Sequence, residues 1–120
     1  MGLVDSKLEA IVVPVSDVDR SRHFYRALGF RLDRDDAAGG VRVVALTPPG
    51  SSCSILIGTG ICSATPGSSC GLLRVDDLEA ACAELQARGA TLRPASRWPT
   101  GVPYVEFDDP DGNRWLLVGS

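Results

Sequence analysis

The chain has 120 residues and a mass of 12.7 kDa, the size of one domain with a single core. Hydrophobic residues make up 44% and charged residues 22%, and the mean hydropathy is +0.07; these values exclude a disordered or membrane-spanning chain. A net charge of −3 argues against nucleic acid as a partner, because phosphate binding needs a basic patch. No apolar stretch follows a basic one at the N-terminus, so we expect no secretory signal and a cytoplasmic protein.

Scarce residue types limit the chemistry that this chain can perform. It has one lysine, Lys7, and one histidine, His23, so a metal site with two histidine ligands from one chain is excluded. We expect His23 on the surface of a helix. The four cysteines lack a CxxC spacing and are interpreted as small core or loop residues rather than disulfide or metal-binding residues: Cys53, Cys62, Cys70 and Cys82.

The first half of the chain predicts one helix among four strands. Residues 8–15 are rich in β-branched side chains and indicate a strand. Asp17 or Asp19 can cap the helix that follows, whose apolar positions fall on one side, and Gly29 ends it. Short strands are predicted near residues 30–33, 41–46 and 54–58, the last two separated by a Pro-Pro-Gly turn.

The second half predicts the same order of elements. A strand is expected at residues 71–75 and a helix at 78–88, followed by strands near 91–93, 104–107 and 114–118. Gly89 takes the place at the helix end that Gly29 has in the first half. Each half is therefore predicted as β-α-β-β-β.

The two halves also share sequence features at a constant spacing. Residues 15–18 (VSDV) recur sixty residues later as 75–78 (VDDL), and Gly29 and Leu32 recur as Gly89 and Leu92. The turn at 47–50 resembles the turn at 109–112 with a shift of 62. We interpret this as a duplication within one domain, with module 1 at about 6–59, module 2 at about 70–119, and residues 60–69 as the linker.

The opening VSDVDRSRHFY and the ending FDDPDGNRWLLV, in this order of elements, resemble the vicinal oxygen chelate superfamily. That superfamily includes glyoxalase I, extradiol dioxygenases, fosfomycin-resistance enzymes and bleomycin-binding resistance proteins. The resemblance covers residues 8–118. It implies an α+β fold of two tandem βαβββ modules, whose curled mixed sheets enclose a cavity. It also implies a homodimer, because members of similar length commonly complete their pockets across paired modules.

The same resemblance tests whether this chain keeps the metal site of the family. The ligand positions on the first and last strands of the modules fall at Ala10, Ser54, Cys70 and Leu116. Alanine and leucine carry no donor atoms, and the other two fall short of the usual three protein ligands. A shift of one residue brings in Glu9, which supplies one carboxylate. We therefore expect no metal and no cofactor.

Strand alternation instead predicts an apolar pocket with a few polar groups, suited to an organic ligand. Leu8, Val12, Pro14 and Val44 are expected to contribute to its lining. Trp98 lies in a Pro- and Gly-rich loop and could stack on a planar ligand, whereas Trp115 is expected in the core. The candidate ligand-binding residues are Arg42, Ser54, Cys70, Arg74, Trp98, Tyr104, Glu106, Arg114 and Leu116.

Three functions remain open at this point. The first is a metal-independent binding protein of the bleomycin-resistance kind, which sequesters an antibiotic or a related metabolite. The second is a metal-free isomerase, cyclase or hydrolase with Glu106 or Tyr104 as acid or base. The third is a metal-dependent lyase or dioxygenase with displaced ligands. Glu106 could also have a structural role instead of a role in binding or catalysis, as the ion-pair partner of Arg114 on the neighbouring strand.

Overall fold

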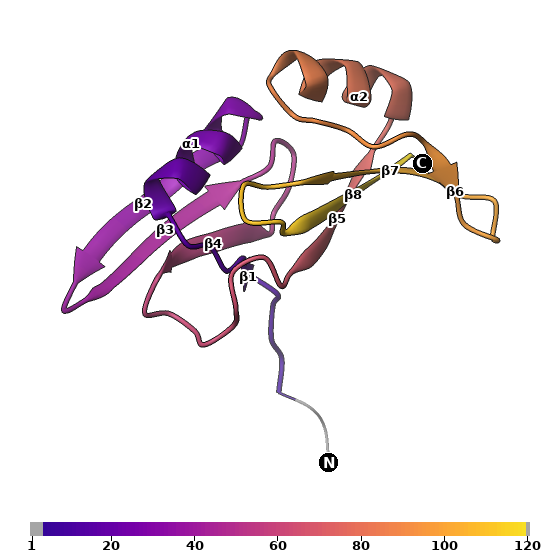
Figure 1. Ribbon diagram of the computed structural model, residues 1–120. Helices are drawn as coiled ribbons and strands as arrows, with labels where there is room; N and C mark the ends of the chain where they lie inside the picture. Colours follow the sequence, from indigo (N-terminus) through magenta and orange to yellow (C-terminus); the bar gives the residue numbers. More distant parts are fainter. Residues whose placement is uncertain (1–3, 120) are drawn as a thin grey trace.

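The computed structural model describes residues 4–119 as two βαβββ modules, each with a four-stranded mixed sheet (Figure 1). Module 1 comprises β1 (Ala10–Val12), α1 (Val18–Ala27), β2 (Arg31–Ala38), β3 (Val41–Thr47) and β4 (Ser54–Thr59). Module 2 comprises β5 (Cys70–Val75), α2 (Leu78–Ala87), β6 (Ser96–Arg97), β7 (Pro103–Asp108) and β8 (Arg114–Gly119). The strand orders are β1-β4-β3-β2 and β5-β8-β7-β6. The predicted fold class is confirmed.

The two helices begin and end in the same way. The Asp17 side chain caps α1 by accepting from the backbone N–H of Arg20, and the Asp77 side chain caps α2 by accepting from that of Ala80, both at 3.0 Å. Gly29 and Gly89 follow the helix ends with φ of 104° and 105°. Glycine is favoured there because other residues rarely adopt such φ values. The predicted equivalence of the two glycines is confirmed.

Three of the predicted strands differ from the structure. β1 is shorter than the predicted strand at 8–15, whereas β2 continues to Ala38 and forms a long hairpin with β3. The predicted strand at 91–93 is wrong: Leu92 forms an isolated bridge to Phe107, and the short strand β6 follows at Ser96–Arg97. Pro94 has no N–H to donate to a strand ladder, which explains the interruption.

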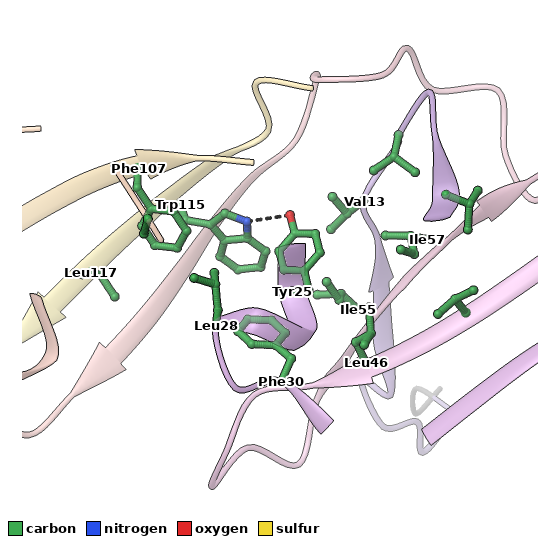
Figure 2. Close-up of a cluster of buried hydrophobic side chains, with 14 of the residues drawn as sticks. Val13, Tyr25, Leu28, Phe30, Leu46, Ile55, Ile57, Phe107, Trp115 and Leu117 are labelled. Atoms are coloured by element: carbon green, nitrogen blue, oxygen red, sulfur yellow. Dashed lines mark hydrogen bonds between the residues drawn. The ribbon is translucent and has the colours of Figure 1, made fainter. Parts of the chain in front are cut away.

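The hydrophobic core joins the two modules. Tyr25 of α1 is fully buried, and its ring packs edge-on against Trp115 of β8, with centroids 6.1 Å apart. The indole N–H of Trp115 donates to the Tyr25 hydroxyl at 2.9 Å (Figure 2), and that hydroxyl donates to Asp109 at 2.7 Å. Burial, and next the Asp109 carboxylate, raise the pKa of Tyr25, so the hydroxyl keeps its proton. Trp115 is a core residue, as predicted.

The molecule is flat and leaves one face of each sheet uncovered. Its extents are 46 × 45 × 25 Å, and its radius of gyration of 15.3 Å exceeds the roughly 13.6 Å expected for a compact chain of this length. Both helices lie on the same side of the sheets (Figure 1). No helix within residues 4–119 is long and apolar enough to cross a membrane.

Candidate functional site

The uncovered face of the second sheet gathers most of the predicted site residues. Directly paired residues on neighbouring strands share a face. The pairs Cys70 with Arg114, Leu72 with Leu116, and Arg74 with Val118 therefore lie on one side. The pairs of β7 with β8 add three more side chains to this side. We call it the second open face, formed by Cys70, Leu72, Arg74, Tyr104, Glu106, Asp108, Arg114, Leu116 and Val118.

Two predicted pocket residues lie on the opposite side of the first sheet. Val44 pairs with Ile57, and both are fully buried in the core beneath α1. Arg42 shares this side and forms ion pairs of 2.9 Å with Asp19 and 3.0 Å with Asp35. The hydrogen bonds that Arg42 donates to these carboxylates, to Asp35 first, raise the pKa of Arg42. Arg42 and Val44 therefore do not share the open side of the sheets with Tyr104 and Glu106, contrary to the strand alternation that was expected.

The error has a definite origin in the hairpin turns. The loop at 48–53 is one residue longer than the loop at 109–113, so β3 and β7 correspond with a shift of 61, whereas β4 and β8 correspond with a shift of 60. The predicted shift of 62 differs from this by one residue, so it assigns every side chain of β3 to the opposite face of the sheet. The structural counterpart of Leu116 is therefore Leu56, which lies opposite Val12, rather than Ser54.

Charged side chains form a linked network on the second open face. Glu106 is held by Arg114 at 3.2 Å, Arg114 also reaches Asp108 at 3.2 Å, and Arg93 reaches Asp108 at 2.7 Å. Hydrogen bonds from Arg93, and then from Arg114, lower the pKa of Asp108. The ion pair anticipated between Glu106 and Arg114 is present. Asp108 was expected only as a possible ion-pair partner of the pocket arginines and Arg93 was not predicted, although Asp108 shares the strand parity of Glu106.

An aromatic pair lies beside this network. The rings of Trp98 and Tyr104 are stacked, with centroids 5.0 Å apart and planes 25° from parallel. The backbone N–H of Trp98 donates to the carbonyl of Val102 at 3.0 Å, which fixes the loop that carries the indole. Tyr104 lies opposite Val118 on β8, and Val118 is 1% exposed although it lies outside the main core. The stack thus provides a partly exposed aromatic surface.

On the open face of the first sheet, β1 and β4 carry neutral groups, whereas β2 adds charged side chains such as Arg31 and Arg34, which lie opposite Thr47 and Ala45. Ala10 and Val12 of β1 lie opposite Ser54 and Leu56 of β4. The Ser54 hydroxyl is 2.7 Å from that of Thr47, which donates to Asp33. With Leu56 in the place of Ser54, the family's ligand positions supply only the thiol of Cys70. Within residues 4–119 no three His, Cys, Asp or Glu side chains are grouped as a metal site.

The remaining predicted residues are placed as follows. Leu72 is 47% exposed, and it lies with Arg74 on the edge strand β5, where both line a cavity beside α2. Cys70 is an exposed free thiol at the start of the same strand. Leu8 is 74% exposed, whereas Pro14 is buried and accepts a hydrogen bond from Asn113. Within the described chain the four cysteines form no disulfide.

Solved structures with this architecture include two proteins from Streptomyces sp. CB03234. TnmS3, an antibiotic binding protein from Streptomyces sp. CB03234, is 33% identical with a TM-score of 0.85, and the alignment covers 98% of each chain. A glyoxalase/bleomycin resistance protein from the same organism is 34% identical, with a TM-score of 0.77 and coverage of 93% of this chain and 99% of that one.

A third match is a superfamily member from Sphaerobacter thermophilus DSM 20745, at 28% identity and a TM-score of 0.83, covering 98% of this chain and 100% of the other. A search of curated proteins finds no relative. The model of the Glyoxalase/Bleomycin resistance protein/Dioxygenase superfamily matches residues 7–117. This match spans nearly the whole chain and agrees with the two βαβββ modules, so the chain belongs to the Glyoxalase/Bleomycin resistance protein/Dioxygenase superfamily.

Proposed function

We propose that this chain is a metal-independent small-molecule binding protein that sequesters an antibiotic or a related metabolite. The observation that carries the proposal is the Trp98–Tyr104 stack beside the Glu106–Arg114 ion pair. Such a surface offers a flat apolar area and hydrogen-bonding groups of both charges, which suits a planar ligand with polar edges. The similarity to TnmS3, an antibiotic binding protein, supports this proposal.

A homodimer completes the site in this proposal. The second open face lacks an opposing wall among residues 4–119. The open face of module 1 from a second copy supplies that wall, with apolar side chains and the hydroxyl of Ser54. A ligand held between the two faces is desolvated on both sides, which strengthens its polar contacts.

A metal-free enzyme is the alternative within the same site. Glu106 or Tyr104 would act there as acid or base. The Glu106 carboxylate already accepts a hydrogen bond from the Arg114 guanidinium at 3.2 Å, and a substrate proton would have to compete with this donor. The ion pair therefore favours binding over catalysis. A metal-dependent lyase or dioxygenase is the least supported function, because the four ligand positions, with Leu56 in the place of Ser54, offer one thiol.

The test is calorimetric titration with bleomycin and with 9-aminoacridine, a flat cationic ring system. Trp98→Ala removes half of the stack and is expected to weaken binding by about 1–3 kcal/mol, which is roughly a 5- to 150-fold rise in Kd. Trp98→Phe keeps an aromatic ring and serves as the matched control, with a smaller loss. Glu106→Gln keeps the shape of the side chain and is expected to change the affinity without unfolding the protein.

Two results would contradict this proposal. Unchanged affinity in both Trp98→Ala and Glu106→Gln would place the ligand elsewhere. Turnover of a bound compound that falls by roughly 10²–10⁴-fold in Glu106→Gln, with little change in Kd, would establish the enzyme instead. Metal analysis of the protein purified without a histidine tag distinguishes both cases from a metal-dependent activity.

A further inference from the structure

A cavity of about 470 Å³ lies where the two modules meet beside α2, away from the Trp98–Tyr104 stack. Its volume falls within the range of small-molecule sites. Module 1 contributes the end of α1 and the β3–β4 loop, and module 2 contributes β5, α2 and one residue of β8. Side chains central to its wall are Leu28, Phe30, Leu73, Ala81, Leu85 and Leu117.

Because the two modules are duplicates, they meet at two equivalent junctions. We call the junction that holds the cavity the second junction. The first junction is the one where the 109–113 loop meets module 1, and its space is filled. The 109–113 loop of module 2 packs onto β1 and α1 of module 1. Asp111 accepts from the backbone N–H of Ser16 at 3.1 Å, and Asp109 accepts from the Tyr25 hydroxyl at 2.7 Å. The Asn113 amide donates to the Pro14 carbonyl at 2.7 Å. These bonds seal the first junction.

The second junction lacks the groups that would seal it. Its loop carries Pro48 and Pro49, which have no hydrogen-bonding side chains, in the place of the acidic 109–113 loop. With a shift of sixty residues, Leu85 takes the place of Tyr25 and Ala81 that of Ser21. α2 accordingly has no fully buried residue, whereas α1 buries Val18, Ser21 and Tyr25. The cavity results from this asymmetry between two otherwise equivalent junctions.

The chemistry of the lining identifies the class of ligand. Leu28 and Phe30 are 5% exposed and Leu117 is fully buried, so the floor is apolar; Figure 2 shows these side chains around the end of α1. The exposed guanidinium of Arg74 lies at the rim and donates to the Gly119 carbonyl at 3.4 Å. Glu84, also at the rim, is engaged by Arg88 at 3.2 Å. We propose that this cavity is a second binding site, for a small molecule with an apolar body and a carboxylate.

The proposed site lies away from the Trp98–Tyr104 stack and meets the second open face along the edge strand β5, at Leu72 and Arg74. β5 is an edge strand, so the cavity extends around its free edge and includes the core-side residues Leu73 and Val75. Neither Trp98 nor Glu106 lines it. An apolar chain of about ten carbons fits the floor, and its carboxylate meets Arg74 through a charge-assisted hydrogen bond.

The experiment is a titration of the full-length protein with decanoate, followed by the methyl signals of its leucines in ¹³C NMR. The expected result is a saturable shift of the Leu73, Leu85 and Leu117 methyls, with Leu56 and Leu116 on the open faces unchanged. Decanol, which lacks the charge, is expected to bind roughly tenfold more weakly than decanoate. Arg74→Gln is expected to remove this preference.

Ala81→Phe places a ring in the cavity and is expected to abolish the decanoate shifts. Ala83→Phe is the matched control, because it adds the same ring to a part of α2 that does not line this cavity, and it is expected to keep them. If Ala81→Phe does not fold, the wild-type shifts and Arg74→Gln decide the question. Shifts confined to Leu56 and Leu116, or unchanged decanoate binding in folded Ala81→Phe, would overturn the proposal. Junction shifts that follow protein concentration instead of decanoate would assign the cavity to a second copy of the chain and also overturn it.

Discussion

Tyr25 makes a buried polar contact between the modules, because its hydroxyl accepts from Trp115 and donates to Asp109. Tyr25→Phe leaves the buried indole N–H without this acceptor and removes one donor from a buried carboxylate. We expect the free energy of unfolding to fall by about 1–3 kcal/mol, measured by urea denaturation. Tyr104→Phe is the matched control and should change it little, because Tyr104 is only partly buried on the open face. Equal losses in the two variants would contradict the assigned role.

The ion pairs of Asp108 make the free energy of unfolding depend on pH in the acidic range. Arg93, and then Arg114, hold the pKa of this carboxyl below its ordinary value of about 3.9. A lower pKa in the folded state means that stabilisation is complete above about pH 5 and is lost as the pH falls through the folded-state pKa. Urea unfolding at pH 6 and pH 3 should therefore show a smaller loss of stability in Asp108→Asn than in the natural protein. The difference is expected to be small, because solvent screens this partly exposed group. Equal losses of stability between pH 6 and pH 3 in the two proteins would contradict the prediction.

At the scale of the strands, Gly71 shows how tightly β5 fits against the core. A Cβ at Gly71 would lie 2.5 Å from the Trp115 ring, closer than real Cβ contacts. Gly71→Ala should therefore displace the indole and lower the free energy of unfolding by about 1–3 kcal/mol. Gly119→Ala is the control, because its Cβ would meet only Leu78 at an ordinary 3.4 Å. Thermal unfolding of the two variants measures the difference, and an unaffected Gly71→Ala would contradict this packing.

Most of the fold could be predicted at this scale, because caps, end glycines and alternation are local signals. Alternation placed Glu106, Tyr104 and Arg114 on one face, since no irregularity interrupts β7 or β8. It failed for Arg42, because the turn after β3 is one residue longer than the turn after β7. Side chains alternate between the two faces of a strand, so an error of one residue in the alignment of the modules assigns Arg42 to the wrong face. The stack of Trp98 on Tyr104 could not be predicted, since it depends on how the 98–102 loop folds back.

At the scale of the whole molecule, the accessible surface is larger than expected for a compact monomer. The accessible surface is 7483 Å², whereas a compact monomer of 12.7 kDa exposes roughly 6,200 Å². The excess of roughly 1,300 Å² is comparable to what each partner buries in a stable dimer, about 800 Å² or more. An excess of this size supports pairing of each open face with that of a second copy.

We therefore expect a homodimer at tens of micromolar protein in sedimentation equilibrium. Leu116→Glu puts a charge in the middle of the second open face, where desolvation by the partner would be costly, and should shift the protein toward monomer. Val4→Glu is the matched control, because Val4 is 89% exposed on the N-terminal segment, and it should leave the dimer intact. A natural protein that stays monomeric under these conditions would contradict the homodimer, and the ligand would then have to bind to a single open face.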